Sequence, residues 1–192
     1  MLFRSPYKGV IDGDFMYRNT QPTNKIFSRK LFTRLNATFE KNDSVCILLM
    51  LEAKGLCSTD EAMYHYRVGH ASMSNSFKIH EFIGTVEQIG KIREHVRNKK
   101  GVSNDLLEYF DFMMIDAIIK TLAVASAKGK KDVYIKFKKA LRDYDPKCNK
   151  YCRKIFMKEQ GRLKYLAIMN ILPRSYLVSR LLIGAMLRGK LQ

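Results

Sequence analysis

The residues of this chain that could perform chemistry include Asp43, which stands where a helix is expected to begin. A helix N-terminus stabilises a carboxylate and holds it rigidly. Such a carboxylate can remove a proton from a hydroxyl group as its oxygen attacks an electrophilic carbon. Asn42, Asp43 and Ser44 also suit a plain capping triplet, which is the simpler interpretation of these three residues alone. Both roles of Asp43 therefore stay open at this point.

A second candidate set follows at Arg67 and Ser72. A leaving group that departs with growing negative charge must be met by a fixed cation and by hydrogen-bond donors. Arg67 stands at the end of a short strand expected over residues 62–67, and Ser72 and Ser74 lie in the following loop. The pair is suited to an anionic leaving group. His70 lies between them, where it is more simply a loop histidine.

The order of these elements resembles the second half of a family 2, GT-A type bacterial glycosyltransferase. Residues 24–29 match an N-K-x-F-x-R element. Residues 64–74 read Y-H-Y-R-x-x-x-x-S-x-S and resemble the family's Y-Y-R-x-x-x-x-S-x-S element. Asn42 and Asp43 stand where the family has a Glu-Asp pair, so the Glu is replaced by Asn. The resemblance covers about residues 20–80 and does not include the half of such an enzyme that binds the sugar nucleotide.

The resemblance implies roles for these residues. Asp43 would be the catalytic base, Arg67 and Ser72 would contact the nucleotide diphosphate, and His70 would lie near the diphosphate or the metal. The implied reaction moves a sugar from a nucleotide-sugar donor to a glycan or lipid-linked acceptor, in polysaccharide or cell-wall synthesis. The implied metal is Mg or Mn, with its main ligands in the absent half, so we expect no activity from this chain alone. A D-x-D sequence at residues 12–14 is better explained as a turn.

Charge indicates an anionic partner. The net charge is +17, and residues 128–192 hold 18 Lys and Arg but only 4 Asp and Glu. Membrane phospholipid, a nucleotide or a polyanion would each fit such a balance, whereas no stacking or recognition-helix pattern supports nucleic acid. The four cysteines form no disulfide framework, and no signal peptide precedes them, so we expect a cytoplasmic chain.

The C-terminal segment favours a membrane surface more specifically. An apolar stripe that includes Leu181 is flanked by Arg174, Arg180 and Arg188, as in helices that lie in the interface of an anionic leaflet. A helix packed on its own domain or on a partner protein is an equal alternative from the pattern alone. The transferase resemblance favours a peripheral position on the inner face of the plasma membrane.

The expected fold is mainly α, with a short α+β N-terminal segment followed by a C-terminal helical bundle. Residues 1–80 would be the acceptor-side portion of a GT-A domain, and residues 81–192 a basic helical region. Apolar residues recur at helical spacing from Phe82 to Val96, and Ser103 is a good cap for a helix that ends near Gly129. Further helices are expected at 131–144, with Val133, Phe137 and Leu141 on the apolar side, and at 149–171 and 175–188. The alternative to the transferase is a non-catalytic basic module that docks on a membrane or on a partner protein.

Overall fold

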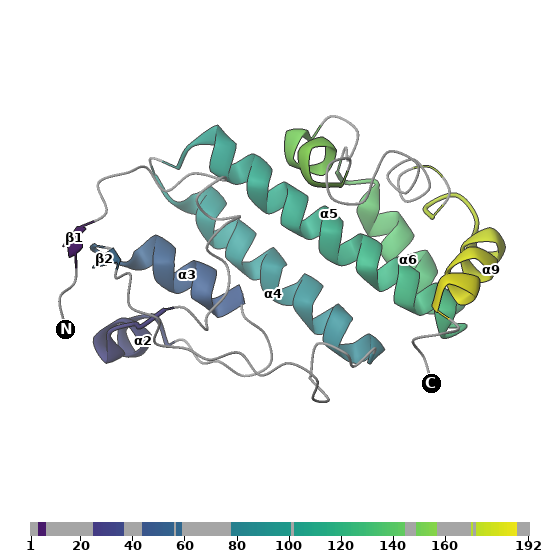
Figure 1. Ribbon diagram of the computed structural model, residues 1–192, viewed down its shortest axis with the longest axis horizontal. Helices are drawn as coiled ribbons and strands as arrows, with labels where there is room; N and C mark the ends of the chain where they lie inside the picture. Colours follow the sequence, from purple (N-terminus) through teal and green to yellow (C-terminus); the bar gives the residue numbers. More distant parts are fainter. Residues whose placement is uncertain are drawn as a thin grey trace. The chain divides into compact units, whose positions relative to one another are not determined.

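The computed structural model describes residues 4–6, 25–36, 44–55, 57–58, 78–100, 102–144, 149–156, 170 and 172–187 (Figure 1). These residues are mainly α-helical, which confirms the predicted fold class. The chain divides into two compact units, unit 1 at residues 1–73 and unit 2 at residues 74–192. The predicted strand at residues 62–67 lies outside the described residues.

The described part of unit 1 includes the helices α2 (Arg29–Leu35) and α3 (Ser44–Glu52), which contact each other. The Nη2 atom of Arg34 donates to the carbonyl of Glu52 at 2.6 Å and so joins the end of α2 to the end of α3. Helix α3 ends close to the predicted Ala53 and buries Cys46, Ile47, Leu49 and Met50. A short antiparallel pair, β1 (Arg4–Pro6) with β2 (Cys57–Ser58), belongs to the same unit.

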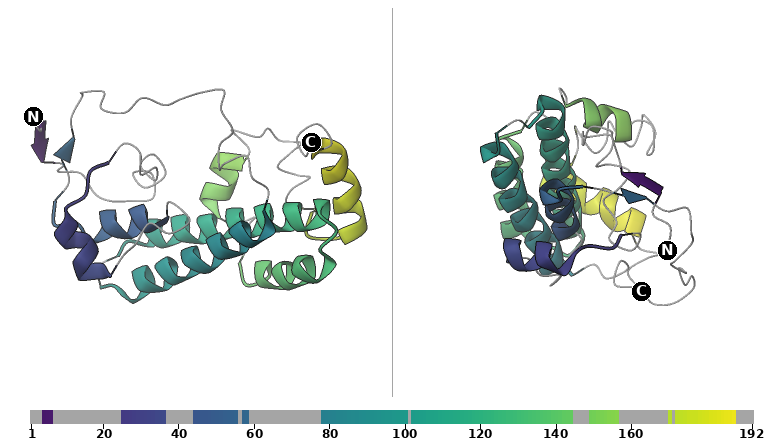
Figure 2. Two further views of the ribbon diagram at one scale, coloured as in Figure 1. Left: turned by 90° about the horizontal axis from the view of Figure 1, so that it is seen from below. Right: turned by 90° about the vertical axis from the view of Figure 1, so that its left-hand side faces the viewer.

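Unit 2 is built around one long helix, α5 (Asn104–Ala127). It contacts α4 (Ile79–Asn98), α6 (Lys131–Leu141), the π-helical turn η3 (Cys152–Phe156) and α9 (Tyr176–Leu187), as the views in Figures 1 and 2 show. The sequence predicted one apolar side for α5, but buried residues occur all round it. A helix that is surrounded by neighbours has no free face, which explains this difference.

Three local signals of unit 2 act as the sequence predicted. The Ser103 Oγ accepts a hydrogen bond from the Leu106 N–H at 3.2 Å, which caps α5. Gly129 follows α5 with φ +70°, a left-handed conformation that glycine adopts without a steric penalty. On α4 the buried residues follow the predicted helical spacing: Val86, Ile89, Ile92 and Val96.

The apolar side predicted for α6 needs one correction. Phe137 and Leu141 are buried as expected, but Tyr134 is buried in place of Val133, which is only half-buried. The Tyr134 hydroxyl donates to the Leu172 carbonyl at 2.5 Å, so a polar group is satisfied inside the helix contact. The rotation of α6 is therefore set by a hydrogen bond as well as by hydrophobicity.

Candidate functional site

The predicted site residues fall into two groups. Asp43, Arg67, His70, Ser72 and Arg188 lie outside the described residues, although α3 begins at Ser44, the next residue after Asp43 in the sequence. Arg174, Arg180 and Leu181 are described and belong to the segment that leads into and forms α9. A site can therefore be built from the structure only around α9.

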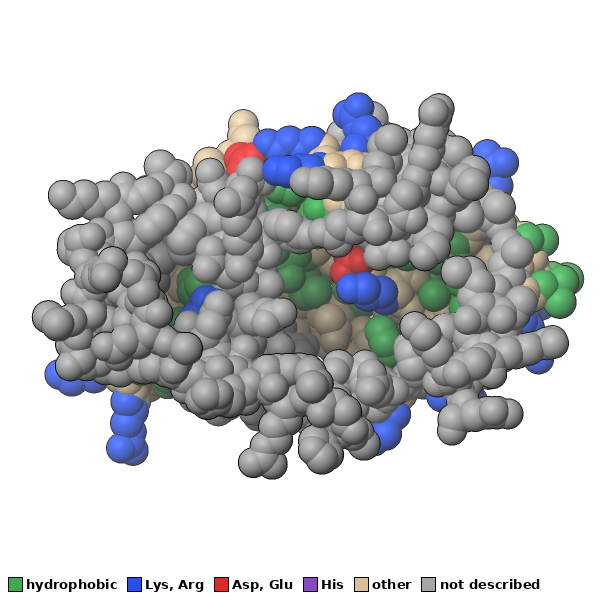
Figure 3. Space-filling model, viewed as in Figure 1, with side chains coloured by type: hydrophobic (Ala, Val, Ile, Leu, Met, Phe, Trp, Pro, Cys, Tyr) green, Lys and Arg blue, Asp and Glu red, His purple; other side chains and the backbone are tan. Residues whose placement is uncertain are grey.

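Among the described side chains of α9, three large apolar ones are exposed. Leu177 is 69% exposed, Leu181 is 74% exposed and Val178 is 43% exposed. Residues four apart lie on the same side of a helix, so Leu177 and Leu181 are neighbours on its surface. Figure 3 shows hydrophobic side chains protruding at the right-hand edge, over α9. Their exposure together on one helix is typical of a binding surface rather than of scattered surface residues.

The opposite side of α9 packs on α5, and polar and aromatic contacts join it to the preceding turn and to Tyr134 of α6. Ser179 is 1% exposed, and its Oγ lies 2.7 Å from the Ser175 carbonyl and 3.0 Å from the Leu172 carbonyl. The rings of Tyr134 and Tyr176 meet edge to face with centroids 5.3 Å apart. Burial raises the pKa of Tyr134, partly offset by its hydrogen bond with Ser179, so the tyrosine is a neutral donor at physiological pH. Because these contacts use the opposite side of α9, Leu177 and Leu181 stay exposed on the outer side of the helix.

The turn between α5 and α6 lies next to α9 as well. A Cβ built on Gly129 would lie 3.8 Å from the Nη2 of Arg180 and 3.9 Å from the Tyr176 hydroxyl. Lys138 extends to the Arg174 carbonyl, which its Nζ reaches at 2.9 Å. The segment that leads into α9 is therefore joined to the end of α6 through Lys138, and α9 itself lies beside the turn at Gly129.

Most exposed cations of α6, of the turns on either side of it and of α9 have no acidic partner among the described residues. The structure gives no ion pair to any of the following exposed residues within its described part: Lys128, Lys130, Lys131, Lys136, Lys139, Arg142, Arg174 and Arg180. Ile135 is 55% exposed among the lysines of α6. We call the exposed apolar residues of α9, Leu177, Val178 and Leu181, together with Arg174 and Arg180, the α9 surface. The α9 surface therefore combines exposed apolar side chains with two arginines.

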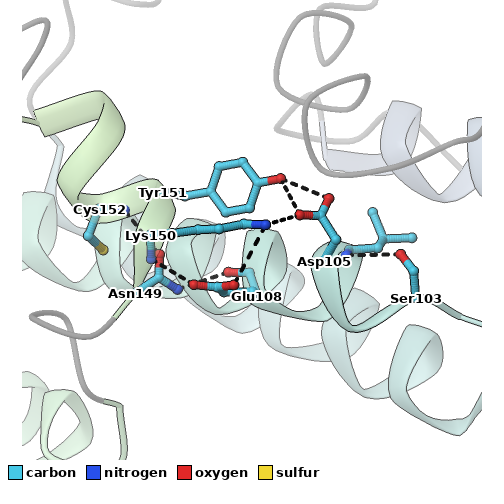
Figure 4. A network of polar contacts seen from close by, with 8 residues as sticks. Ser103, Asp105, Glu108, Asn149, Lys150, Tyr151 and Cys152 are labelled. Atoms are coloured by element: carbon cyan, nitrogen blue, oxygen red, sulfur yellow. Dashed lines mark hydrogen bonds and ion pairs between the residues drawn. The ribbon is translucent and has the colours of Figure 1, made fainter.

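A different polar cluster joins the start of α5 to the segment before η3 (Figure 4). The Lys150 ammonium pairs with Asp105 and lies 3.9 Å from Glu108, while the Tyr151 hydroxyl donates to both Asp105 oxygens at 3.0 and 2.9 Å. Asn149 is buried and donates through Nδ2 to the Glu108 carbonyl at 2.9 Å. Every polar group drawn here has a partner, so the cluster is suited to holding two segments together rather than to binding a ligand.

Neighbouring this cluster is the fully buried thiol of Cys152. Burial, and to a lesser degree the carboxylates of Asp116 and Glu108, raise the pKa of Cys152 to about 12. A thiol with so high a pKa is protonated and unreactive at neutral pH. Cys152 is therefore suited to packing rather than to nucleophilic chemistry.

The residues that the structure describes hold no group of three or more His, Cys, Asp or Glu side chains that could bind a metal ion. Within the same residues, no helix has both the length and the apolar character needed to cross a bilayer.

Sequence reasoning missed Tyr134 and the Asp105–Lys150 pair. Tyr134 stands three and seven residues before Phe137 and Leu141, a helical spacing that could have placed it on the buried side of α6. No comparable signal exists for Asp105 and Lys150, because 45 positions separate them and only the tertiary fold brings them together.

Comparisons with known proteins give no match: no protein-family model, no curated protein and no solved structure is similar to this chain.

Proposed function

We propose that unit 2 holds the chain on an anionic membrane surface through the α9 surface, and that residues 20–80 are the acceptor-side portion of a glycosyltransferase acting there. The observation that carries the docking is the exposure of Leu177, Val178 and Leu181 beside Arg174 and Arg180. The order of motifs in residues 24–74 carries the transferase.

The α9 surface can make the two contributions that binding at a membrane interface requires, transfer of apolar side chains and attraction of cations to the leaflet. Moving an exposed leucine into an apolar phase is worth about 1.5–3 kcal/mol, and each basic residue near an anionic leaflet adds about 1 kcal/mol. Leu177 and Leu181 supply the first contribution, and Arg174 and Arg180 supply the second. Because the sum exceeds the marginal binding of a single weak anchor, α9 is suited to lie in the headgroup region with its apolar side toward the acyl chains.

Sedimentation with phosphatidylglycerol vesicles tests the docking with a matched pair of variants. Leu181 and Ile26 are 74% and 71% exposed, but only Leu181 belongs to the α9 surface. We expect Leu181→Ser to weaken vesicle binding about tenfold or more, from the lost transfer energy of one leucine. Ile26→Ser should bind like the unchanged chain. Equal binding by both variants, or no binding by the unchanged chain, would overturn the docking.

The transferase proposal follows from residues in unit 1. Asp43 would deprotonate the acceptor hydroxyl, and Arg67 and Ser72 would meet the charge of the departing diphosphate. The structure supports only the setting: α2 begins at Arg29, at the end of the N-K-x-F-x-R element, and α3 begins directly after Asp43 in the sequence. His70 and a bound Mg or Mn remain part of the proposal through the resemblance.

Turnover measurements test this assignment. The resemblance does not extend to a sheet that binds the donor, so we expect the purified chain to transfer no sugar from a panel of UDP- and GDP-sugars. When a donor-binding half is supplied, Arg67→Ala should reduce turnover more than Ser72→Ala, because a cation opposite developing charge is worth more than a neutral donor. Full activity in Asp43→Asn would eliminate Asp43 as the base.

The second candidate function is a non-catalytic basic module that docks on a membrane surface or on a partner protein. It is favoured by the position of the whole α9 surface in unit 2, whereas the candidate transferase residues Asp43, Arg67 and Ser72 belong to unit 1. Docking therefore needs none of the transferase chemistry. Vesicle binding that survives in Asp43→Asn together with absent turnover under all conditions would leave the module as the function.

A further inference from the structure

We propose that the turn between α5 and α6 and the adjoining side of α9 form a binding site for the phosphate of an anionic phospholipid. The site, named here the Gly129 corner, consists of Lys128, Gly129, Lys130, Tyr176 and Arg180. It rests on the docking proposed above and adds to it a defined position for the lipid headgroup.

The corner is shaped by the backbone of Gly129. Its φ of +70° turns the chain back directly after α5, and the Lys130 N–H closes that helix by donating to the Ala125 carbonyl at 2.8 Å. From α9, Arg180 and Tyr176 reach the same place, with the Arg180 Nη2 and the Tyr176 hydroxyl 3.8 and 3.9 Å from where a Cβ of Gly129 would lie. Two exposed lysines, Lys128 and Lys130, stand on either side of the glycine.

The charges of the corner are not used inside the protein. Among the described residues no carboxylate pairs with Lys128, Lys130 or Arg180, and the sequence of α9 contains no acidic residue. The nearest acid along the chain is the exposed Asp132, two positions beyond Lys130. The Arg180 guanidinium lies beside Gly129, and the two lysines adjacent to that glycine in the sequence are exposed. Cations gathered at one turn without an acidic partner among the described residues create a positive potential that attracts an anion from outside.

The types of side chain match a phosphate. A guanidinium offers two parallel N–H donors to phosphate oxygens, a lysine supplies a compact charge, and the Tyr176 hydroxyl adds a neutral donor. Arg180 is three residues after Leu177 and one before Leu181, both strongly exposed. This adjacency of cation and apolar side chains favours a lipid over a free phosphate ion, because only a lipid offers both a phosphate and an apolar tail.

Binding of the full chain to phosphatidylglycerol vesicles tests the corner with two double variants of equal charge. Lys128→Gln with Arg180→Gln removes one Lys and one Arg from the corner. Lys91→Gln with Arg97→Gln removes the same types from exposed positions of α4 in the same unit. With about 1 kcal/mol per cation at the leaflet, the corner variant should bind about tenfold to thirtyfold more weakly, and the α4 variant less than about threefold.

Each outcome decides the matter once circular dichroism has verified that both variants are folded. Equal weakening by the two variants would overturn the corner while the docking stands, since net charge alone would then explain binding. An unchanged chain that binds no vesicles would overturn both proposals. Replacing chloride by inorganic phosphate at equal ionic strength should leave vesicle binding intact; abolished binding would assign the corner to free phosphate and overturn the lipid.

Discussion

Unit 2 uses its cations in two contrasting ways. Where α5 meets α4 and the segment before η3, cations are paired: Arg93 with Asp111 and Lys150 with Asp105. Within α5 itself, Lys120 pairs with Asp116 at 2.6 Å. On the side of α6 and α9, exposed lysines and arginines have no acidic partner among the described residues. The same residue types therefore serve cohesion in one region and leave charge available in the other.

The difference teaches where in this chain to look for a binding function. Arg93 both pairs with Asp111 and lies 5.2 Å from the ring centroid of Tyr144, so its charge is satisfied from two sides. The Arg180 guanidinium lies beside the turn at Gly129, and no carboxylate among the described residues pairs with it. An unpaired cation adds little to stability and much to the external potential, which makes the α9 side the region for binding.

We call the part of unit 2 that holds these ion pairs, α4, α5 and the segment from residue 149 through η3, the paired region. The largest expected effect is the change of the free energy of unfolding at alkaline pH, which comes from Cys152 in this region. Folding keeps the Cys152 thiol neutral, with its pKa raised to about 12 from an ordinary value of 9.0. Stability from this group is therefore intact below pH 9 and is lost as the pH rises from 9 toward 12, at about 1.4 kcal/mol per pH unit. The free energy of unfolding can be measured in urea at pH 8 and at pH 11. Between these two pH values it should fall by about 2–3 kcal/mol more in the unchanged chain than in Cys152→Ala. An identical loss in both chains would contradict this.

A somewhat smaller effect is expected from Asp105→Ala. The substitution removes the acceptor of the Tyr151 hydroxyl and the partner of Lys150, and Tyr151 is 2% exposed. A buried donor that loses its acceptor costs about 1–3 kcal/mol. Chemical unfolding should give a loss of about 2 kcal/mol, against less than about 0.5 kcal/mol for Glu87→Ala, an exposed acid on α4. A loss no larger than that of the control would mean that the cluster does not hold η3 to α5.

The smallest effect on stability is expected on the unpaired side. Arg180→Gln removes a charge with no described acidic partner, so the free energy of unfolding should change by less than about 0.5 kcal/mol. The same variant should still bind phosphatidylglycerol vesicles more weakly than the unchanged chain. A large destabilisation would show that Arg180 is a structural residue, and the contrast between the two regions would then fail.

The sequence predicted the fold where the signal is local. The stripe of α4, the Ser103 cap and the end of α5 near Gly129 depend on residues within a turn or two of each other. Tyr134 shares the helical spacing of Phe137 and Leu141, but the acceptor that satisfies its buried hydroxyl is the Leu172 carbonyl, 38 positions away, which no local pattern reveals. The exposure of Leu177 and Leu181 was likewise undecidable from the stripe alone, since an amphipathic pattern does not tell whether the protein itself covers the apolar side.

The central claim, that α9 enters an anionic membrane while the paired region stays in water, has a direct measurement. The chain contains no tryptophan, so Leu177→Trp and Glu87→Trp each give a single fluorescent reporter, one on α9 and one on α4. With phosphatidylglycerol vesicles, the emission of Trp at position 177 should shift to shorter wavelength and become shielded from iodide, whereas Trp at position 87 should keep its emission and its quenching. Unchanged emission at position 177, or equal shifts at both positions, would contradict the account.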